Sequence, residues 1–493
     1  VWCQNPEGLS SKRNPIYFEK SCIHCRRCEQ YANDGQMTYQ NDRPYFNKEC
    51  ENFDNLVKYC PTGAIRYDSE LYDIEELMIK IKQDEVFFRE EGGVTFSGGE
   101  PFMQGDFLIE ILKRCHEEGI HTAIETSLHV SLDLMKQALP YLDLIYVDLK
   151  IYDHQKHQQY TGVSSHLIKN NTIHHCGQAG IVGHLGGVFS VIENNHIYNI
   201  NQYDVPKGLE TAGIKLHAAI DVIIRDNFIH DTERGIWLDW QAQGAQVSNN
   251  LITDSKAQDL FLEVNHGPIL VYNNVFLSKE GLLIDSQGVA CFNNLFKGRV
   301  KLRTSEIRYT PYHVAHSTKV KGFFSNNGGD VRFYNNIFLK NNSKEKGLSI
   351  YNSYPTYEES LKQKLNNTKE FLTYKLPVSI SANVYLNKGY SFRTEKEAVE
   401  ADNENWQFEM IPDGGRVDFE FKVNDDILRK VNTKSVSTST LRQAMIPEAI
   451  YENPDGSGFI LDRDFLGNPR MAEKPLPGPF EKQFSGNKIY GVK

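Results

Sequence analysis

The sequence predicts a mixed fold, in which a truncated α/β partial barrel is followed by an all-β right-handed parallel β-helix. Three observations support this: a cysteine cluster in the first 60 residues, alternating strand and helix patterns over residues 73–150, and an Asn-Asn repeat over residues 168–338. A chain of 493 residues is long enough for two or three domains. We expect domains at residues 1–165, 166–345 and 346–493, the last a β-rich region that completes the β-helix or packs on it.

Composition narrows the class of protein. The net charge of −10 argues against a general affinity for nucleic acid or anionic membranes. No apolar run reaches the ~18–20 residues that span a bilayer. The chain begins Val1-Trp2-Cys3, without a start Met or a basic-apolar leader, so we expect the native N-terminus to be missing.

Six of the nine cysteines lie in the first 60 residues. Cys22, Cys25 and Cys28 follow the tight spacing of bacterial ferredoxins, and Cys60 begins the distant Cys-Pro turn that supplies a fourth thiolate. We predict one 4Fe-4S cluster here, and the alternative is four free cysteines. Such clustering indicates metal chemistry in a reducing compartment, the cytoplasm, rather than disulfides. The positions that a second cluster would need hold other residues, namely Ala32, Phe53 and Leu56.

A β-α alternation follows the cysteines. Asp73–Glu76 is a capping box that predicts an amphipathic helix through about Glu91. This alternation indicates a parallel sheet or barrel. The further predicted elements are a strand at 94–97, a helix at 106–118, a strand at 121–125, a helix at 132–139 and a strand at 144–150.

Several motifs in this part carry a family resemblance: Trp2–Gly8, the ferredoxin-like insert at about 15–70, Phe96–Pro101, Glu125–Ser127, Asp148–Asp153 and His157–Val163. In this order they resemble a glycyl-radical-enzyme activating protein of the radical S-adenosylmethionine (radical SAM) superfamily. The resemblance implies a 4Fe-4S cluster, S-adenosylmethionine as cofactor and a glycyl radical enzyme as partner.

The same resemblance assigns roles to individual residues. Cys3 would be the third cysteine of the family's C-x3-C-x2-C loop, and Gly98, Gly99 and Glu100 would contact the methionine amino group. The other two loop cysteines would precede Val1, and the later barrel strands are missing. We therefore expect this half to be catalytically inactive, even if its insert binds iron and sulfide.

The pattern changes within a few residues near 164–171. Residues up to Val163 follow the activating-protein pattern, and residues from Ile168 follow a different one, with no Pro/Gly/Ser linker between them. Leu167–Asn171 fits both patterns. We interpret the chain as a chimera joined at this point by recombination or assembly error, with a natural bifunctional fusion as the alternative.

A short repeat dominates the second part. Alternating apolar residues fit a narrow core, and stacked Asn amides would satisfy polar groups at the turns. Most copies lie about 20–32 residues apart, which is one coil of a solenoid. Leucine-rich repeats are the competitor, but they favour Leu-rich spacing with a single Asn. The copies begin at Ile168, Ile192, Ile224, Val247, Val271, Cys291 and Phe333.

Two carboxylates interrupt this repeat nearly one coil apart. Asp239 lies between Trp237 and Trp240, and Glu263 follows in the next coil. Adjacent rungs are about 4.8 Å apart, which suits the carboxyl separation of about 5–5.5 Å in a retaining glycosidase. The tryptophans would stack on sugar faces. The alternative is that both acids are solvated rung residues.

Trp237–Gly244, Asp259–Pro268, Asp285–Gly288 and Tyr312–Ser317 resemble glycoside hydrolase family 120, the β-xylosidases built on a β-helix. The resemblance implies that Asp239 is the nucleophile and Glu263 the acid/base, with no cofactor in this half. Family members carry a long N-terminal region that activating-protein sequence replaces here.

Three further residues are weaker candidates for binding sugar. Glu210 could contact sugar hydroxyls or be a surface turn acid. His217 and His266 could bind substrate or be hydrogen-bonded structural residues. The leading hypothesis is a β-xylosidase acting on xylo-oligosaccharides or aryl xylosides, and the alternatives are a radical SAM activating protein and a non-catalytic carbohydrate-binding β-helix.

Overall fold

The computed structural model separates the chain into two compact units, residues 1–148 and 149–493. The described residues are 12–47, 49–50, 52–88, 92–127, 130–147, 167–183, 188–203, 210–339, 347–364, 366–367, 370, 373–387, 390–402, 406–482 and 484–491. The expected boundary after residue 165 therefore lies outside them, as do Cys3 and the motifs at 2–8, 148–153 and 157–163.

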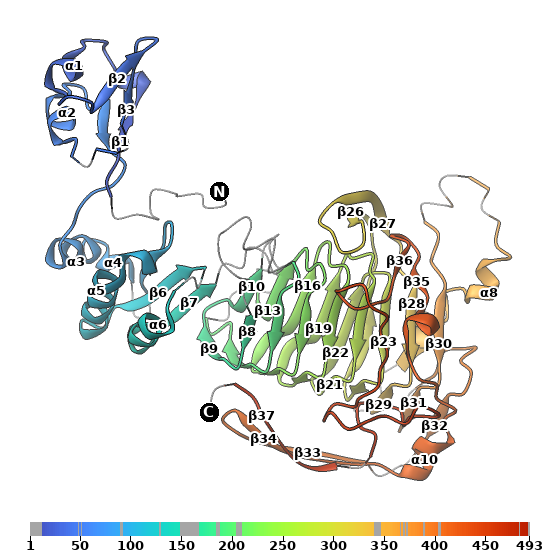
Figure 1. Ribbon diagram of the computed structural model, residues 1–493. Helices are drawn as coiled ribbons and strands as arrows, with labels where there is room; N and C mark the ends of the chain where they lie inside the picture. Colours follow the sequence, from blue (N-terminus) through green and yellow to red (C-terminus); the bar gives the residue numbers. More distant parts are fainter. Residues whose placement is uncertain are drawn as a thin grey trace. The chain divides into compact units, whose positions relative to one another are not determined.

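The cysteine-rich insert is small and built from two antiparallel strand pairs with two short helices (Figure 1). Phe53, Leu56 and Ile65 form its core, and Cys28, Cys50 and Cys60 pack against them. Its elements are β1 (Pro15–Tyr17), the 3-10 helix η2 (Glu19–Ser21), α1 (Arg27–Tyr31), β2 (Met37–Gln40), β3 (Arg43–Phe46), α2 (Asp54–Tyr59) and β4 (Ile65–Tyr67).

The α/β part is a three-stranded parallel sheet in the order β5-β6-β7. The capping box of Asp73 and Glu76 begins α3 as predicted, but the expected long helix is interrupted at Gln83 and Asp84. The apolar face of α5 packs with α3 and the sheet through Leu108, Ile111 and Leu112. The elements are α3 (Ile74–Lys82), α4 (Glu85–Phe88), β5 (Gly93–Phe96), η3 (Pro101–Gln104), α5 (Gly105–Glu117), β6 (His121–Thr126), α6 (Leu132–Ala138), η4 (Leu139–Tyr141) and β7 (Leu144–Val147).

The second unit is a parallel β-helix whose coils stack three sheets of eight, nine and six strands, which confirms the predicted fold (Figure 1). The eight-stranded sheet contains β8 (Leu167–Lys169), β11 (Val191–Glu193), β14 (Ile223–Arg225), β17 (Ala245–Ser248), β20 (Ile269–Tyr272), β23 (Val289–Phe292), β28 (Val331–Tyr334) and β30 (Val378–Ser381). The nine-stranded sheet contains β9 (Thr172–Cys176), β12 (His196–Ile200), β15 (Phe228–His230), β18 (Leu251–Ile252), β21 (Val275–Phe276), β24 (Leu295–Phe296), β29 (Ile337–Leu339), β31 (Val384–Leu386) and β32 (Val399–Ala401). The six-stranded sheet, on which the candidate site lies, contains β10 (Ala179–Gly183), β13 (Ala212–His217), β16 (Thr232–Asp239), β19 (Ser255–Glu263), β22 (Glu280–Asp285) and β25 (Arg299–Leu302).

The Asn-Asn repeat explains how each coil turns. The first residue of the pair adopts the left-handed conformation, as at Asn249 (φ 54°) and Asn273 (φ 54°). The second residue is buried, and its amide donates to the amide oxygen of the next coil, as from Asn250 to Asn274 at 3.0 Å. The ladder runs through Asn171, Asn195, Asn227, Asn250, Asn274, Asn294, Asn336 and Asn383. It ends on the half-buried carboxylate of Glu395, 2.7 Å from Asn383.

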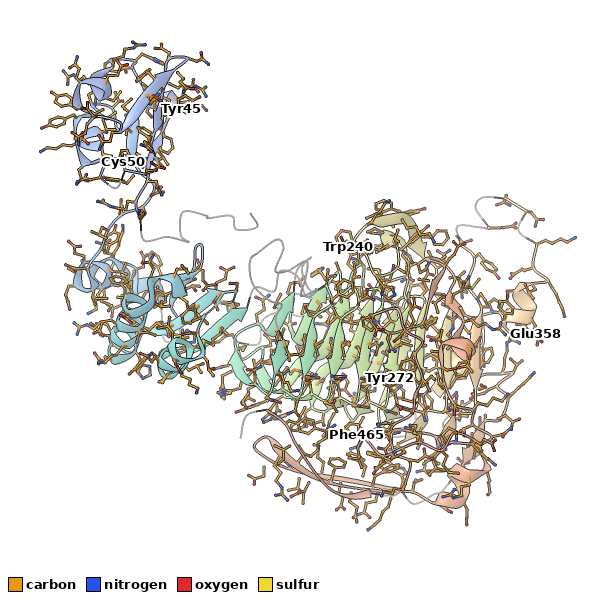
Figure 2. The ribbon with its side chains drawn as sticks, in the orientation of Figure 1. Tyr45, Cys50, Trp240, Tyr272, Glu358 and Phe465 are labelled. Atoms are coloured by element: carbon orange, nitrogen blue, oxygen red, sulfur yellow. The ribbon has the colours of Figure 1, made fainter. Side chains whose placement is uncertain are left out.

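The C-terminal region both extends and covers the β-helix. Strands β30, β31 and β32 continue two of its sheets, and Ala382 and Asn383 replace the usual Asn pair. The antiparallel sheet of β33 (Gln407–Asp413), β34 (Arg416–Lys422) and β37 (Phe484–Ile489) packs on the nine-stranded sheet through Phe419, Phe421 and Phe480. Phe465, labelled in Figure 2, joins this apolar layer. The remaining elements are β26 (Ser305–His313), β27 (Val320–Asn326), η5 (Gly347–Tyr351), α8 (Tyr357–Ser360), α10 (Asp425–Lys430), α11 (Thr438–Leu441), β35 (Gln443–Ala444) and β36 (Ala449–Ile450).

No helix among the described residues is long and apolar enough to cross a bilayer.

Candidate functional sites

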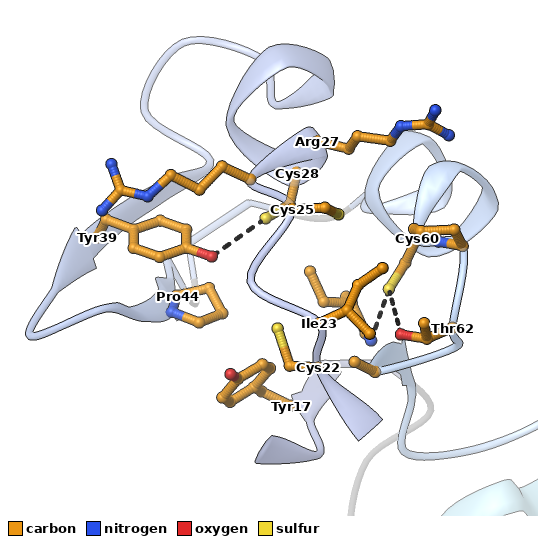
Figure 3. Close-up of a pocket in the computed structure, with 14 residues that line it drawn as sticks. Tyr17, Cys22, Ile23, Cys25, Arg27, Cys28, Tyr39, Pro44, Cys60 and Thr62 are labelled. Atoms are coloured by element: carbon orange, nitrogen blue, oxygen red, sulfur yellow. Dashed lines mark hydrogen bonds between the residues drawn. The ribbon is translucent and has the colours of Figure 1, made fainter. Parts of the chain in front are cut away.

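The four predicted cluster cysteines line one pocket of the insert. Cys22 and Cys25 lie along the loop that leads into α1, Cys28 lies in the first turn of α1, and Cys60 follows α2 on the facing side (Figure 3). The loop can wrap back on itself because His24 (φ 53°) adopts the left-handed conformation, as does Arg26 (φ 54°). Local backbone geometry thus brings Cys22, Cys25 and Cys28 together, and the fold of the insert adds Cys60.

The surroundings of these thiols fit a cluster of iron and sulfide. The backbone N–H groups of His24 and Ile65 each donate to a cysteine sulfur at 3.3 Å, to Cys22 and Cys60 respectively. Such N–H···S bonds and an apolar lining are typical of thiolate ligands to iron. The described cysteines are all free. The apolar side of the pocket is formed by Tyr17, Ile23, Tyr39, Pro44, Pro61 and Ile65.

Two tyrosines that line this pocket have raised pKa values. The interaction with the neighbouring Cys22 thiol, together with burial, raises the pKa of Tyr17 to about 12. Burial and a hydrogen bond with Cys28, whose Sγ lies 3.6 Å from the phenol oxygen, raise the pKa of Tyr39. Both tyrosines therefore stay neutral and can donate hydrogen bonds to sulfur. Cys50 does not line this pocket, and its sulfur lies 3.9 Å from the carbonyl oxygen of Gly35.

Gly98, Gly99 and Glu100 lie at the carboxyl end of β5. Both glycines have positive φ (84° and 71°), a conformation that most side chains avoid. Glu100 is buried, and its carboxylate accepts hydrogen bonds from Thr126 Oγ1 (2.7 Å) and from the Ser127 N–H and hydroxyl (2.9 and 2.6 Å). In the described structure Glu100 thus links the ends of β5 and β6, and a contact with S-adenosylmethionine remains a prediction.

Two rows of outward-facing side chains cross the six-stranded sheet. The residues that pair across neighbouring strands in one row are Lys215, Trp237, Phe261 and Leu283. The adjacent row, at the strand ends, consists of His217, Asp239, Glu263 and Asp285. Asp239 and Glu263 come one residue after the paired Leu238 and Leu262, so they occupy equivalent positions on adjacent rungs. The predicted juxtaposition of the two carboxylates is therefore present.

The two carboxylates have different surroundings. Asp239 Oδ2 lies 2.6 Å from Lys215 Nζ and 3.5 Å from His217 Nε2. Its other oxygen, Oδ1, is buried and accepts no hydrogen bond from the described residues. Glu263 Oε2 accepts a hydrogen bond from Trp237 Nε1 (3.1 Å), and its Oε1 lies 2.7 Å from Arg308 Nη1. One acid is thus bound to a lysine, and the other to an indole and to arginine.

Burial and the negative charge of Asp239 raise the pKa of Glu263, and Arg308 and Arg303 oppose this rise. Both arginines are nearly half exposed, 44% and 48%, so water screens their charges. The direction is the one that a general acid needs, because a raised pKa keeps the proton on the carboxyl group near neutral pH.

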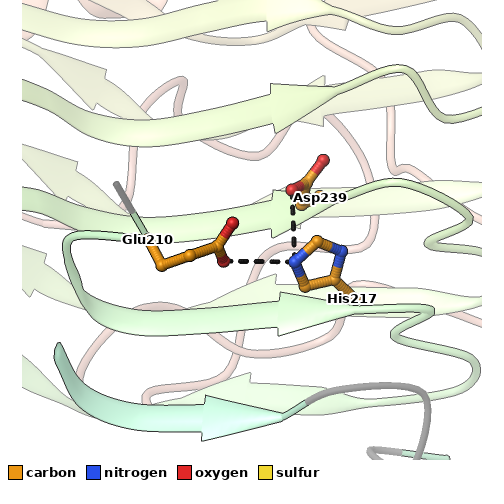
Figure 4. Close-up of side chains that lie close together, drawn as sticks. All are labelled: Glu210, His217 and Asp239. Atoms are coloured by element: carbon orange, nitrogen blue, oxygen red, sulfur yellow. Dashed lines mark hydrogen bonds and ion pairs between the residues drawn. The ribbon is translucent and has the colours of Figure 1, made fainter. Parts of the chain in front are cut away.

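Lys215, which was not among the predicted site residues, completes this site. It precedes His217 by two residues on β13 and so projects on the same face of the sheet. A lysine at an outward strand position is usually a solvated surface residue. Lys215 is buried because Trp237 and Glu210 pack around its ammonium. Glu210, His217 and Asp239 offer ligand atoms within 4.8 Å of one another (Figure 4). The Lys215 ammonium lies among them and contacts all three.

The other predicted sugar-binding residues differ in accessibility. Glu210 is about half exposed and bonds Lys215 Nζ (2.6 Å) and His217 Nε2 (3.1 Å). Trp240 follows Asp239 in the turn after β16 and is partly exposed (Figure 2). Trp237 is only 5% exposed, because Lys215 Nζ and Arg234 cover its ring at 3.7 and 4.6 Å. Its contacts favour a role in holding Glu263 over one as an open sugar platform.

His266 is buried, and its ring bridges the β-helix and the β26–β27 hairpin. Nε2 lies 3.0 Å from the Thr310 carbonyl oxygen, and Nδ1 lies 2.8 Å from Gln287 Nε2. Burial lowers the pKa of His266 to about 4, so its ring is neutral. This geometry favours the structural alternative for His266. The same hairpin supplies Arg308 to Glu263 and thus forms a wall of the site.

Comparison with known proteins divides the chain in the same way. Residues 58–188 match the Radical SAM superfamily, and residues 146–299 match the right handed beta helix region. The 4-hydroxyphenylacetate decarboxylase activating enzyme of Clostridioides difficile (strain CD196) is 38% identical over 178 residues, 34% of this chain and 56% of that enzyme. The indoleacetate decarboxylase activating enzyme of Tractidigestivibacter scatoligenes is 35% identical over 181 residues, 34% of this chain and 58% of that enzyme.

A solved structure, the complex of XylC with xylose, matches with a TM-score of 0.62 and 36% sequence identity. The match covers 74% of this chain and 60% of XylC. The chain thus spans little more than half the length of the curated relatives that it matches. These findings confirm the two-part interpretation: the chain joins a Radical SAM part, homologous to glycyl-radical-enzyme activating enzymes, to a right-handed β-helix similar to XylC.

Proposed function

We propose that the β-helix part is a retaining glycoside hydrolase of β-xylosidase type, acting on xylo-oligosaccharides or aryl xylosides. The observation that carries this proposal is the placement of Asp239 and Glu263 on adjacent rungs with different partners. Neighbouring strands are about 4.8 Å apart, close to the separation of about 5–5.5 Å that lets one carboxylate attack directly. The likeness to a xylose-binding neighbour supports xylose as the sugar.

The two carboxylates have different tasks in this mechanism. Asp239 Oδ1 bonds to the anomeric carbon while the glycosidic bond breaks, and the leaving oxygen keeps the electron pair and takes the proton of Glu263. Glu263, now ionised, removes a proton from water. The water oxygen replaces Asp239 on the anomeric carbon and restores its carboxylate, so the sugar keeps its configuration.

The test replaces the nucleophile without changing its shape. Asp239→Asn should abolish hydrolysis of an aryl xyloside while xylo-oligosaccharide binding, followed calorimetrically, survives. Asp254→Asn, at an exposed turn of the next coil, is the matched control and should keep full activity. Hydrolysis that persists in Asp239→Asn contradicts the nucleophile assignment. A wild-type chain that binds xylo-oligosaccharides but hydrolyses no xyloside would instead make this a non-catalytic carbohydrate-binding β-helix.

For the N-terminal part we propose a 4Fe-4S cluster held by Cys22, Cys25, Cys28 and Cys60, in a protein of the reducing cytoplasm. When bound, such a cluster supplies electron transfer. The shared pocket and the N–H···S bonds support this assignment. The activating-enzyme relatives support S-adenosylmethionine as a cofactor and a glycyl radical enzyme as partner.

We further propose that this part does not generate a radical in the present chain. After β7, the next described strand is β8, which already belongs to the β-helix. The described parallel sheet of this part therefore has three strands. Formation of 5′-deoxyadenosine from S-adenosylmethionine, by the reconstituted and reduced chain, would contradict this proposal.

A further inference from the structure

Lys215 is a fully buried charged side chain of the carboxylate site, with an exposed fraction of 0%. Its ammonium lies 2.6 Å from Asp239 Oδ2, 2.6 Å from Glu210 Oε2 and 3.7 Å from the centre of the Trp237 ring. A fully buried ammonium is tolerated only where partners replace its hydration. The site therefore contains a fixed cation directly beside the proposed nucleophile.

The contacts of Lys215 distinguish the two oxygens of Asp239. Oδ2 is bound by Lys215, whereas Oδ1 accepts no hydrogen bond from the described residues. A carboxylate held through one oxygen cannot rotate freely, so the other oxygen keeps a fixed direction. A free lone pair on a buried carboxylate oxygen is what an attacking atom requires, since hydrogen bonds to that oxygen would have to break first.

The charges around the second carboxylate differ in strength. Arg303 and Arg308 contact Glu263, but both are nearly half exposed, and exposed ion pairs are weak. Lys215 is shielded from water, so its interaction with Asp239 is the stronger one. The negative charge of Asp239 in turn contributes to the raised pKa of Glu263.

We propose that Lys215 is the positioning residue of the nucleophile: it holds Asp239 through Oδ2 and leaves Oδ1 as the attacking atom. This inference rests on the proposed glycosidase function. It adds to that function a residue that transfers no proton during the reaction. Lys215 acts through Asp239 and Glu210, and it touches neither the reacting carbon nor the leaving group in this scheme.

The test compares Lys215→Met with Lys301→Met. Lys301 lies in the same outward row, on β25, and forms its ion pair with Glu280. Lys215→Met should lower kcat/KM for an aryl xyloside by about 100-fold or more, as for loss of one preorganised charge in a closed site. The acidic limb of its pH profile should move to higher pH, because Asp239 no longer has a cation that competes with the proton. Lys301→Met should keep the wild-type rate and profile.

A second variant distinguishes a loss of stability from a change in the pH profile of activity. Lys215→Met leaves Glu210 and Asp239 facing each other without a cation, so its melting temperature should fall at neutral pH and recover on acidification. Glu210→Gln combined with Lys215→Met removes the excess negative charge and should restore much of the stability, yet keep the shifted pH profile.

The outcomes separate the two proposals. A wild-type rate and pH profile in Lys215→Met, with Asp239→Asn inactive, overturns the role of Lys215 and leaves the glycosidase standing. A lower rate with an unmoved pH profile in both Lys215 variants also overturns it, because that result indicates a structural role only. A wild-type chain that hydrolyses no xyloside overturns the glycosidase and, with it, the role of Lys215.

Discussion

The cysteine pocket and the carboxylate row are both chemical sites, but they are assembled over different lengths of chain. Cys22, Cys25 and Cys28 share one loop, and only Cys60 comes from elsewhere in the insert. The row of His217, Asp239, Glu263 and Asp285 takes one residue from each of four coils, 22 to 24 residues apart. The first site depends on local backbone geometry and the second on the register of a whole solenoid.

The two sites also differ in how their charges are balanced. The thiols are partly exposed and receive backbone N–H groups, and the positive charge beside them would come from the proposed cluster. The carboxylates are buried against Lys215, Arg303 and Arg308 and are balanced by the chain itself. The comparison implies that each site can be destroyed without the other, which the following variants test in order of decreasing effect.

Removal of one predicted cluster ligand should have an all-or-none effect. After anaerobic reconstitution with iron and sulfide, Cys60→Ala should lose the bound iron and the visible absorption of the cluster, because three thiolates from one loop leave a corner of the cluster unligated. Cys50→Ala, in the same insert but apart from the pocket, is the matched control and should keep both. Xyloside hydrolysis should be unchanged in both variants, and full iron content in Cys60→Ala would contradict the ligand set.

Removal of the proposed acid should affect only the carboxylate row. Glu263→Gln should lower kcat/KM by about 10²–10⁴-fold for xylosides with poor leaving groups, since general acid catalysis contributes that range. The loss should shrink for nitrophenyl xylosides, whose leaving groups need little protonation. Iron content after reconstitution should match the wild type. An equal loss for good and poor leaving groups would count against Glu263 as the acid.

The asparagine ladder should contribute measurably to the stability of the β-helix. Asn274→Ala removes an amide that donates to Asn294 Oδ1 and Val247 O and accepts from the Asn250 backbone and side chain. Leaving such buried groups unsatisfied should lower the unfolding free energy by about 3 kcal/mol. Denaturant unfolding, followed by tryptophan fluorescence, measures this change. Asn366→Ala, in an exposed segment, should leave the unfolding free energy unchanged.

These regions show what the sequence could and could not reveal. The repeat predicted the coils because each Asn pair has two local tasks, a left-handed turn and a ladder amide. The coil at Ala382 and Asn383 was not predicted from the repeat, because Ala382 replaces the first Asn of the pair. Asn383 nevertheless continues the ladder. Cys22, Cys25, Cys28 and Cys60 were found from their spacing alone.

The candidate site was predicted only in part. Asp239 and Glu263 stack on adjacent coils as expected, because each is the last outward-facing residue of its strand. Lys215 was missed, since its burial depends on Trp237 of the next coil and on Glu210 of the preceding turn. The repeat therefore predicts which residues stack on adjacent coils. It does not predict which buried charges neutralise one another, because these depend on contacts between coils and turns.

The smallest predicted effect concerns the hairpin that walls the carboxylate row. His316, at its tip, lies 3.1 Å from both Asp221 Oδ2 and Glu452 Oε1. Burial opposes the charged form of His316, but the carboxylates outweigh it and raise its pKa, while burial raises the pKa of Asp221 to about 6.

Both shifts mean that the folded chain binds protons more tightly than the unfolded chain, so this contribution to stability is present at low pH. It falls as pH rises through about 6 and is lost as His316 deprotonates. His316→Gln should therefore lower the unfolding free energy by about 1 kcal/mol near pH 5.5 and by less near pH 8. A stability difference between wild type and variant that is equal at both pH values would show that His316 binds its partners as a neutral ring, and that the hairpin is held by the Gln243–His313 and His266–Thr310 contacts instead.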